Sequence, residues 1–242
     1  MILIENTQVV GLEAAIRGMR NPMNSWDKSD SEFEVDCSIC SNPHYDCREC
    51  PISNVDSMEH TLIGPNDHDL MMRLAKQGAV HGKFRRMIVV YVDITAPLYW
   101  WKEFDTYQVG TVKNSCSTMH KIHAKEFAPD DFSHEHLIME EPILGRVYSP
   151  LGMMATTVEN LNKIRELFLE TRDKKWWWQI IALLPSCYNQ KRTVMLNYEV
   201  LANIYQYRRE HKLDEWRELC KWIEGLPYSG IITCNAGGVD HD

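Results

Sequence analysis

Four cysteines form the most specific local pattern in this 242-residue sequence. Cys37-x2-Cys40 and Cys47-x2-Cys50 are two pairs separated by six residues, and four thiolates at this spacing are typical of a closed tetrahedral zinc site. The surrounding segment has no hydrophobic period, so bound metal would supply the folding free energy that apolar burial cannot. The alternatives are an iron–sulfur cluster, a redox dithiol or four reduced thiols in a loop, and His44 could replace one ligand.

A run of small polar side chains is the second candidate site. Its hydroxyl, thiol and amide groups can hydrogen-bond a phosphate or an amide, and its members are Asn114, Ser115, Cys116, Ser117 and Thr118. As a nucleophile, Cys116 would need a nearby base such as His120. A solvated loop is the alternative for each of these residues.

The charge balance limits the classes of partner. Lys and Arg number 26 against 34 Asp and Glu, which gives a formal net charge of −8. A protein that binds nucleic acid without sequence preference needs a basic surface to neutralise phosphates, so such binding is not expected, although a local basic site remains open. With 44% hydrophobic and 25% charged residues, the composition is that of an ordinary globular chain.

Neither a membrane nor a secretory pathway is indicated. The longest apolar stretches, such as 87–92 and 180–185, fall far short of the roughly 20 residues that span a bilayer. The first residues lack the basic region and the small-residue cleavage site of a signal peptide. We therefore expect a cytoplasmic protein, and in a reducing compartment a tight cysteine cluster binds metal more often than it forms disulfides.

The first half of the chain predicts strands, short helices and one insertion. The polar, cysteine-containing segment cannot build an apolar core, and we assign an inserted four-cysteine zinc knuckle to residues 33–53. Residues 87–95 are almost all apolar and predict a central strand buried on both faces, followed by an aromatic helix that begins at Ala96-Pro97. The other periodic segments are a strand at 1–10, a helix at 12–19 and a helix from the capped turn 64–67 to about 77.

Helical spacing dominates the second half of the chain. Strands early and helices late predict an α+β fold, with helices packed on a mixed or mostly antiparallel sheet in a single domain over residues 1–242. Neither a Gly-x-Gly-x-x-Gly after a strand nor a Gly-x4-Gly-Lys-Ser/Thr is present, which argues against Rossmann and P-loop nucleotide binding. The expected helices are 119–127, 158–171, 174–184, 193–211 and 213–225.

Two blocks of sequence resemble the flavin-dependent thymidylate synthases, the ThyX family. The first block has the family's order of a helix ending in Lys76-Gln77-Gly78, a loop with His81, a strand, and Ala96-Pro97 before an aromatic helix. The second has Leu184-Pro185 and a helix with the family's Asn-x3-Leu-x-Asn-x4-Arg pattern, here ending at Arg208. Together the blocks cover about a third of the chain. The resemblance implies a ThyX-like fold with a long-helix bundle.

The family's signature motif is replaced. The motif Arg-His-Arg-x2-Ser-x-Asn-Glu-x-Ser-x-Arg would fall on residues 106–118, where its arginines, histidine and glutamate are all absent. In the family these residues hold the flavin and the phosphate of dUMP, and Thr or Gln cannot bind phosphate as a guanidinium does. Two further family arginines fall on Ile181 and Glu199.

Several functional positions of the family are retained. The resemblance implies that Asn197 and Asn203 contact the flavin, that His81 does so if one residue is inserted before it, and that Arg208 polarises the pyrimidine. The segment 114–118 would be the replaced nucleotide loop. On a helix, Asn197 and Arg208 are eleven residues apart and share one stripe, which faces either a ligand or a neighbouring helix.

The resemblance implies a reaction and an assembly. The protein would bind FAD, reduce it with NADPH and transfer a methylene group from methylenetetrahydrofolate to dUMP, giving dTMP, as a homotetramer. The aromatic runs 99–101 and 176–178 span more than one helical face, which fits a subunit interface. Two alternatives remain: a diverged relative that binds another nucleotide or a partner without this activity, and a zinc-dependent interaction module on an unrelated helical scaffold.

Overall fold

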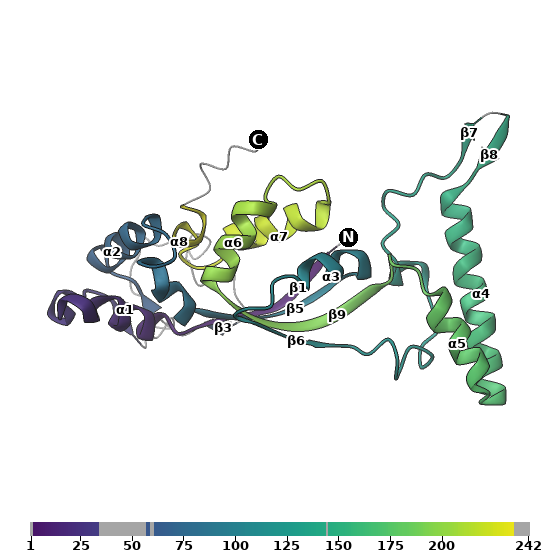
Figure 1. Ribbon diagram of the computed structural model, residues 1–242, viewed down its shortest axis with the longest axis horizontal. Helices are drawn as coiled ribbons and strands as arrows, with labels where there is room; N and C mark the ends of the chain where they lie inside the picture. The colour runs from purple at the N-terminus through teal and green to yellow at the C-terminus, as the bar shows by residue number, and fades with distance from the viewer. Residues whose placement is uncertain (1, 34–56, 59–60, 144, 235–242) are drawn as a thin grey trace, which may run out of the picture. The chain divides into compact units, whose positions relative to one another are not determined.

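The main sheet of this protein has five strands. The computed structural model of the chain describes residues 2–33, 57–58, 61–143 and 145–234. The strand order of the sheet is β3-β1-β5-β9-β6 (Figure 1). Its strands are β1 (Leu3–Val10), β3 (Ser57–Met58), β5 (Val89–Pro97), β6 (Thr111–Ser115) and β9 (Asn189–Asn197).

The described residues also contain two sheets of two strands each and eight α-helices. The pair β1–β3 is parallel, whereas the pairs β2 (Glu32–Phe33) with β4 (Thr61–Leu62) and β7 (Glu141–Ile143) with β8 (Arg146–Tyr148) are antiparallel, so strand pairing is mixed, as predicted. The helices are α1 (Leu12–Arg20), α2 (Pro65–Lys76), α3 (Leu98–Phe104), α4 (Pro150–Thr171), α5 (Lys174–Leu183), α6 (Tyr198–Arg208), α7 (Asp214–Glu224) and α8 (Gly230–Thr233), with short 3-10 turns at η1 (Asn21–Met23), η2 (Trp26–Lys28), η4 (Gly82–Met87) and η5 (Pro129–Asp131).

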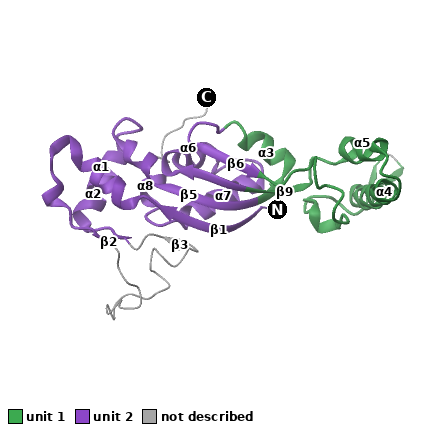
Figure 2. Ribbon diagram, turned by 90° about the horizontal axis from the view of Figure 1, so that it is seen from below, with its two compact units in different colours: residues 1, 95–106, 115–192 green, residues 2–94, 107–114, 193–242 purple. Residues whose placement is uncertain are grey.

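The chain divides into two compact units, which Figure 2 colours separately. Unit 1 contains residues 95–106 and 115–192 together with residue 1, and unit 2 contains residues 2–94, 107–114 and 193–242. Strands β5, β6 and β9 each contribute residues to both units. Among the described helices, none is both long enough and apolar enough to cross a membrane.

Unit 2 is built around β5 and the helices α1, α2, α6, α7 and α8. β5 lies in the middle of the sheet, as the sequence predicts. However, Val90, Val92 and Ile94 are buried while Tyr91 is 43% exposed, so the prediction that both faces are buried is wrong. The largest fully buried side chains of this unit include Leu12, Ile16, Met71, Ile88, Ile94, Tyr198 and Trp216.

Unit 1 contains the α4–α5 helix pair and the aromatic helix α3. A separate apolar cluster forms its core, with Ile122, Phe127, Phe132, Val158, Leu161 and Ile180 as the buried members. Trp100 and Trp101 are almost completely buried beside Phe104, so this aromatic run packs inside the unit and does not form the expected interface. Trp178 in the second run is 51% exposed.

Three predicted elements are wrong, and each has a local cause. Residues 193–197 belong to β9 rather than to a helix, because Val194 and Leu196 alternate with less buried neighbours in the strand period. Residues 119–127 form turns, since the Ser117 hydroxyl accepts the backbone N–H groups of Met119 and His120 and so competes with a helix. Strand β6 includes residues 114 and 115, which were expected in the replaced nucleotide loop, because these residues pair at the edge of the sheet.

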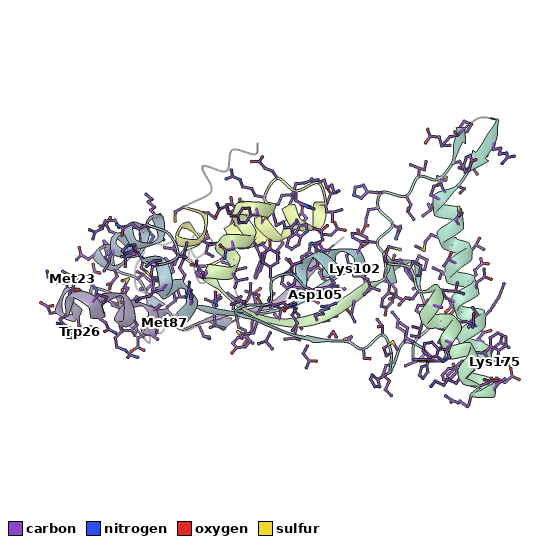
Figure 3. All side chains as sticks on the ribbon, viewed as in Figure 1. Met23, Trp26, Met87, Lys102, Asp105 and Lys175 are labelled. Atoms are coloured by element: carbon purple, nitrogen blue, oxygen red, sulfur yellow. The ribbon has the colours of Figure 1, made fainter. Side chains whose placement is uncertain are left out.

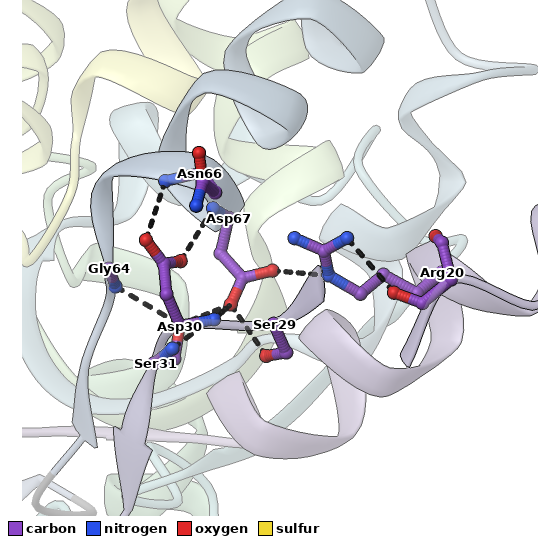
Figure 4. A network of polar contacts seen from close by, with 8 residues as sticks. Arg20, Ser29, Asp30, Ser31, Gly64, Asn66 and Asp67 are labelled. Atoms are coloured by element: carbon purple, nitrogen blue, oxygen red, sulfur yellow. Dashed lines mark hydrogen bonds and ion pairs between the residues drawn. The ribbon is translucent and has the colours of Figure 1, made fainter. Parts of the chain in front are cut away.

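The start of α2 is fixed by a buried carboxylate (Figure 4). Asp67 is fully buried, and its Oδ1 accepts a 2.6 Å bond from Nε of Arg20 at the end of α1. Its Oδ2 accepts bonds from both the backbone N–H and the hydroxyl of Ser31, and also from the Ser29 hydroxyl. The turn 64–67 does not cap its own helix. Instead, Asp30 accepts the N–H groups of residues 66 and 67.

The network lowers the pKa of Asp67. Burial alone would raise the pKa of this carboxyl group, but hydrogen bonds from Ser31, Ser29 and Arg20 and the positive charge of Arg20 outweigh that effect. A depressed folded-state pKa stabilises the fold above the ordinary carboxyl pKa of about 4. This stabilisation disappears as the pH falls through the lower folded value.

We therefore predict that Asp67→Asn lowers the free energy of unfolding at pH 7 by about 3 kcal/mol, because it leaves buried Arg20 without a counter-ion. Asp69→Asn, on the same helix, removes only an exposed ion pair with Arg73 and should cost less than about 0.5 kcal/mol. Denaturant titrations at pH 7 and pH 3 measure both variants. The difference between Asp67→Asn and wild type should shrink at pH 3, and an undiminished difference would contradict the linkage.

Candidate functional site

Arg208, the last residue of α6, lies in an aromatic clamp within unit 2. Its Nε donates a 3.1 Å hydrogen bond to the hydroxyl of Tyr107. Its guanidinium carbon lies 4.7 Å from the ring centroid of Trp216 and 5.9 Å from that of Tyr107. The two rings meet edge to face at 5.9 Å, and Trp216 is fully buried. The clamp therefore fixes both the position and the plane of the guanidinium group.

The chemistry of this clamp suits a ligand that presents acceptor oxygens. A guanidinium group is always charged and offers donors in a rigid planar fork, which matches carboxylate, phosphate or paired carbonyl acceptors. Stacking on Trp216 and Tyr107 adds cation–π attraction and limits rotation. Arg208 is half-buried, so its charge acts in an environment less screened than bulk water.

Asn197 does not lie inside the helix as predicted but is the N-cap of α6. Its Oδ1 accepts the backbone N–H of Val200 at 3.0 Å, which satisfies one of the donors left free at the helix start. Gly110 has a φ of +73°, and a Cβ added there would lie 2.9 Å from Nδ2 of Asn197. Glycine at this position thus permits the close approach of the segment before β6 to Asn197.

Two further positions of α6 that the resemblance singles out lie off the predicted stripe and differ in exposure. Asn203 is exposed, so its amide is accessible to a ligand or to solvent. Glu199, where the family has an arginine, is buried and paired with Arg85, whose Nη2 lies 2.8 Å from its Oε2. Glu199 is therefore a structural residue that joins α6 to η4.

The predicted polar run lies at the end of β6. Asn114 belongs to unit 2, and residues 115–118 belong to unit 1. Asn114, Ser115, Cys116 and Ser117 are exposed, and Thr118 is half-buried. The ring nitrogen Nδ1 of His120 lies 2.7 Å from the Ser117 hydroxyl, so the structure joins His120 to Ser117 in place of the expected base for Cys116.

Gln190 and Arg192 of β9 support this run within unit 1, and sequence reasoning missed both. Nε2 of Gln190 donates to the carbonyl of Cys116 at 2.7 Å, and its Oε1 accepts from Nε of Arg192. Arg192 also pairs with Asp105 at 2.9 Å and stacks 4.2 Å over the ring of Trp101. No alternating pattern in the sequence would have placed them in a strand, because residues 189–193 are all polar.

His81 lies at a different place in unit 2, in the lining of a cavity of about 670 Å³. The lining of the cavity is mostly apolar, and its cationic side chains are those of Lys83 and Arg86. Figure 3 labels Met23 and Met87 of its wall beside α1, together with neighbouring Trp26, and all three are substantially exposed. The lining residues are Gly18, Met19, Pro22, Met23, Ser25, Leu70, Leu74, Val80, His81, Lys83, Phe84, Arg86 and Met87.

The cavity has the size and chemistry of a small-molecule site. Ligand pockets typically measure about 300–1,000 Å³ and combine apolar walls with a few polar groups. Here the walls suit a flat aromatic ring, and the exposed cations suit an acidic group attached to it. Of the predicted flavin contacts, His81 lines this cavity, whereas Asn197 and Asn203 are not among its lining residues.

The four predicted zinc ligands Cys37, Cys40, Cys47 and Cys50 lie outside the described residues. Within the part of the chain that the structure does describe, no group of three or more His, Cys, Asp and Glu side chains is placed to hold a metal ion. The zinc knuckle stays a prediction from the cysteine spacing.

The fold is similar to that of flavin-dependent enzymes. The sequence matches no protein-family model and no curated protein sequence. The structure of thymidylate synthase X (ThyX) from Helicobacter pylori with FAD and dUMP has 14% sequence identity and a TM-score of 0.61, with 98% of this chain and 99% of that chain covered. The UMP/dUMP methylase PolB from Streptomyces cacaoi bound with 5-Br UMP has 11% identity and a TM-score of 0.57, with 98% and 96% covered. At these identities the likeness establishes the fold, and the predicted ThyX-like α+β architecture is confirmed.

We predict that Asn197→Ala lowers the free energy of unfolding by about 1 kcal/mol, because α6 loses its N-cap. Asn203→Ala, at an exposed position of the same helix, should change it by less than about 0.5 kcal/mol. Urea denaturation followed by circular dichroism measures both variants. Equal losses would show that the side chain of Asn197 does not stabilise the helix start.

Proposed function

We propose that this chain is a ThyX-like flavin-dependent thymidylate synthase, which methylates dUMP to dTMP with FAD, NADPH and methylenetetrahydrofolate. The observation that carries the proposal is the ThyX fold over nearly the full length of both chains. The retained Arg208, held by Tyr107 and Trp216, adds a residue of the required chemistry. Bound FAD would supply the hydride, while protein groups bind, orient and polarise the pyrimidine.

The His81 cavity is the place we propose for the flavin ring. Its apolar walls can cover a flat ring system, and Lys83 and Arg86 can neutralise a diphosphate. Asn197 and Asn203 are the proposed amide contacts to FAD, and the second of these is exposed as that role requires. Because Asn197 and Asn203 do not line this cavity, the proposal includes sites shared between subunits of a homotetramer.

Exposed apolar side chains in unit 1 support an assembly. In α4, which has 22 residues, only Val158 and Leu161 are buried, and Met153 is 69% exposed. In α5, Trp178 and Leu183 are each 51% exposed. Apolar surface of this kind is typical of faces that a second subunit covers.

Arg208 and the polar run are the proposed substrate contacts. Arg208 would bind and polarise the uracil edge of dUMP, since its guanidinium group can donate to a carbonyl oxygen on which negative charge develops. Asn114, Ser115, Cys116, Ser117 and Thr118 would hydrogen-bond the nucleotide in place of the family signature. The exchange of guanidinium groups for these side chains also favours the second candidate, a ThyX-fold protein that binds a nucleotide or a partner without thymidylate synthase activity.

The visible absorption spectrum of the purified protein with FAD, followed by titration with dUMP, tests the proposal. We expect a bound-flavin spectrum that dUMP perturbs, because the nucleotide would stack near the flavin. Bound flavin that responds to another nucleotide but not to dUMP would favour the second candidate. Absence of flavin binding would contradict both the cofactor and the reaction.

A charge reversal locates the flavin site. We predict that Lys83→Glu/Arg86→Glu weakens FAD binding at least about 10-fold, because the cavity loses the charges that would pair with the diphosphate. Lys163→Glu/Lys221→Glu changes the net charge equally at exposed positions outside the cavity lining and should leave FAD affinity within about 2-fold. Equilibrium fluorescence titration measures both. Equal weakening by the two variants would indicate only a general charge effect.

A further inference from the structure

Tyr107 stands in the replaced signature segment and yet touches the retained arginine of the second block. Its hydroxyl accepts the Nε–H of Arg208 from a position 101 residues earlier in the chain. Both residues belong to unit 2, as does Trp216, whose ring centroid lies 4.7 Å from the guanidinium carbon. The contact therefore connects two motifs that the sequence presents as independent.

The contact restricts an otherwise mobile side chain. An arginine has several rotatable bonds, and ordering it when a ligand binds costs conformational free energy. The hydrogen bond at Nε, combined with the ring of Trp216 at 4.7 Å, orders the guanidinium before any ligand arrives.

We infer that Tyr107 is a positioning residue, which holds the guanidinium group of Arg208 in the orientation that binds the uracil edge of the nucleotide. This inference rests on the proposed function. Tyr107 acts through Arg208 and is distinct from the polar run 114–118. The segment at the position of the replaced signature thus has a task of its own, which is to orient the arginine that recognises the base.

A double-mutant cycle on the FAD-loaded full-length protein tests this role, with dUMP affinity read from the flavin absorption spectrum. Tyr107→Phe removes only the hydroxyl and should weaken dUMP binding about 10-fold, since a hydrogen bond to a charged group is lost. Arg208→Lys keeps the charge but loses the fork and should weaken it about 100-fold. The double variant should equal Arg208→Lys, because Tyr107 acts only through Arg208.

Tyr205→Phe is the matched control. Tyr205 lies on α6, the helix of Arg208, and donates its hydroxyl to Glu224 at 2.6 Å, so this variant also removes a tyrosine hydroxyl that bonds to a charged side chain. This variant should leave dUMP affinity within about 2-fold of wild type. FAD affinity should stay unchanged in Tyr107→Phe, and its melting temperature should fall no further than that of Tyr205→Phe, which separates positioning from a loss of fold.

Each other outcome overturns the inference. Unchanged dUMP affinity in Tyr107→Phe, or a further loss when it is added to Arg208→Lys, overturns the positioning role and leaves the proposed function standing. A parallel fall in FAD affinity, dUMP affinity and melting temperature identifies Tyr107 as merely structural. Wild-type protein that binds FAD without any response to dUMP overturns the proposed function and this inference together.

Discussion

The carboxylate of Asp67 holds together the segments that form the His81 cavity. Through Oδ1 it fixes Arg20 at the end of α1, and Arg20 in turn donates to the carbonyl of Ser25. Ser25 lines the cavity, and so do Met19, which precedes Arg20, and Leu70, one turn beyond Asp67 in α2. Asp67 itself is not part of the lining. A buried ion pair can therefore fix the lining of a cavity without being part of that lining. Loss of one partner lowers the free energy of unfolding by several kcal/mol, because the other charge stays buried.

The position of Arg208 follows from a second constraint, at the other end of α6. Three contacts anchor the helix start: Asn197 caps it, the N–H of Tyr198 donates to the carbonyl of Ile88, and Glu199 pairs with Arg85. A helix of 11 residues spans about 16 Å and is stiff over that length. Once the start is fixed, the azimuth of Arg208 is fixed as well, and Tyr107 only has to orient the end of the side chain. The identity of residue 199 matters for this anchoring and not for ligand contact.

Sequence periodicity predicted the elements whose cause is local. The apolar faces of α1, α2, α5 and α7 recur at helical spacing, and the β-branched run of β5 predicts a central strand. The prediction from periodicity failed at the β9–α6 junction, because no Gly or Pro separates the strand from the helix. Asn197 fits equally well as a residue inside a helix or as its N-cap. The decisive site contacts are long-range: Asp30 caps a helix 36 residues later, and Tyr107 meets Arg208 across 101 residues. Such pairings depend on the sheet that brings the segments together, and no local pattern encodes them.

At the positions that would correspond to the ThyX signature, this chain makes contacts of its own. Tyr107 is a partner of Arg208, and the backbone of Cys116 is held by Gln190 and by the carbonyl of Lys191. These contacts maintain the backbone course of the segment, but neutral side chains cannot replace three guanidinium groups in binding a phosphate. Under the proposed function, Arg208 would therefore recognise the nucleotide through its base rather than through its phosphate. A site of that kind selects for the pattern of carbonyl and N–H groups on the pyrimidine edge, and binding depends less on ionic strength than it does where phosphate contacts dominate.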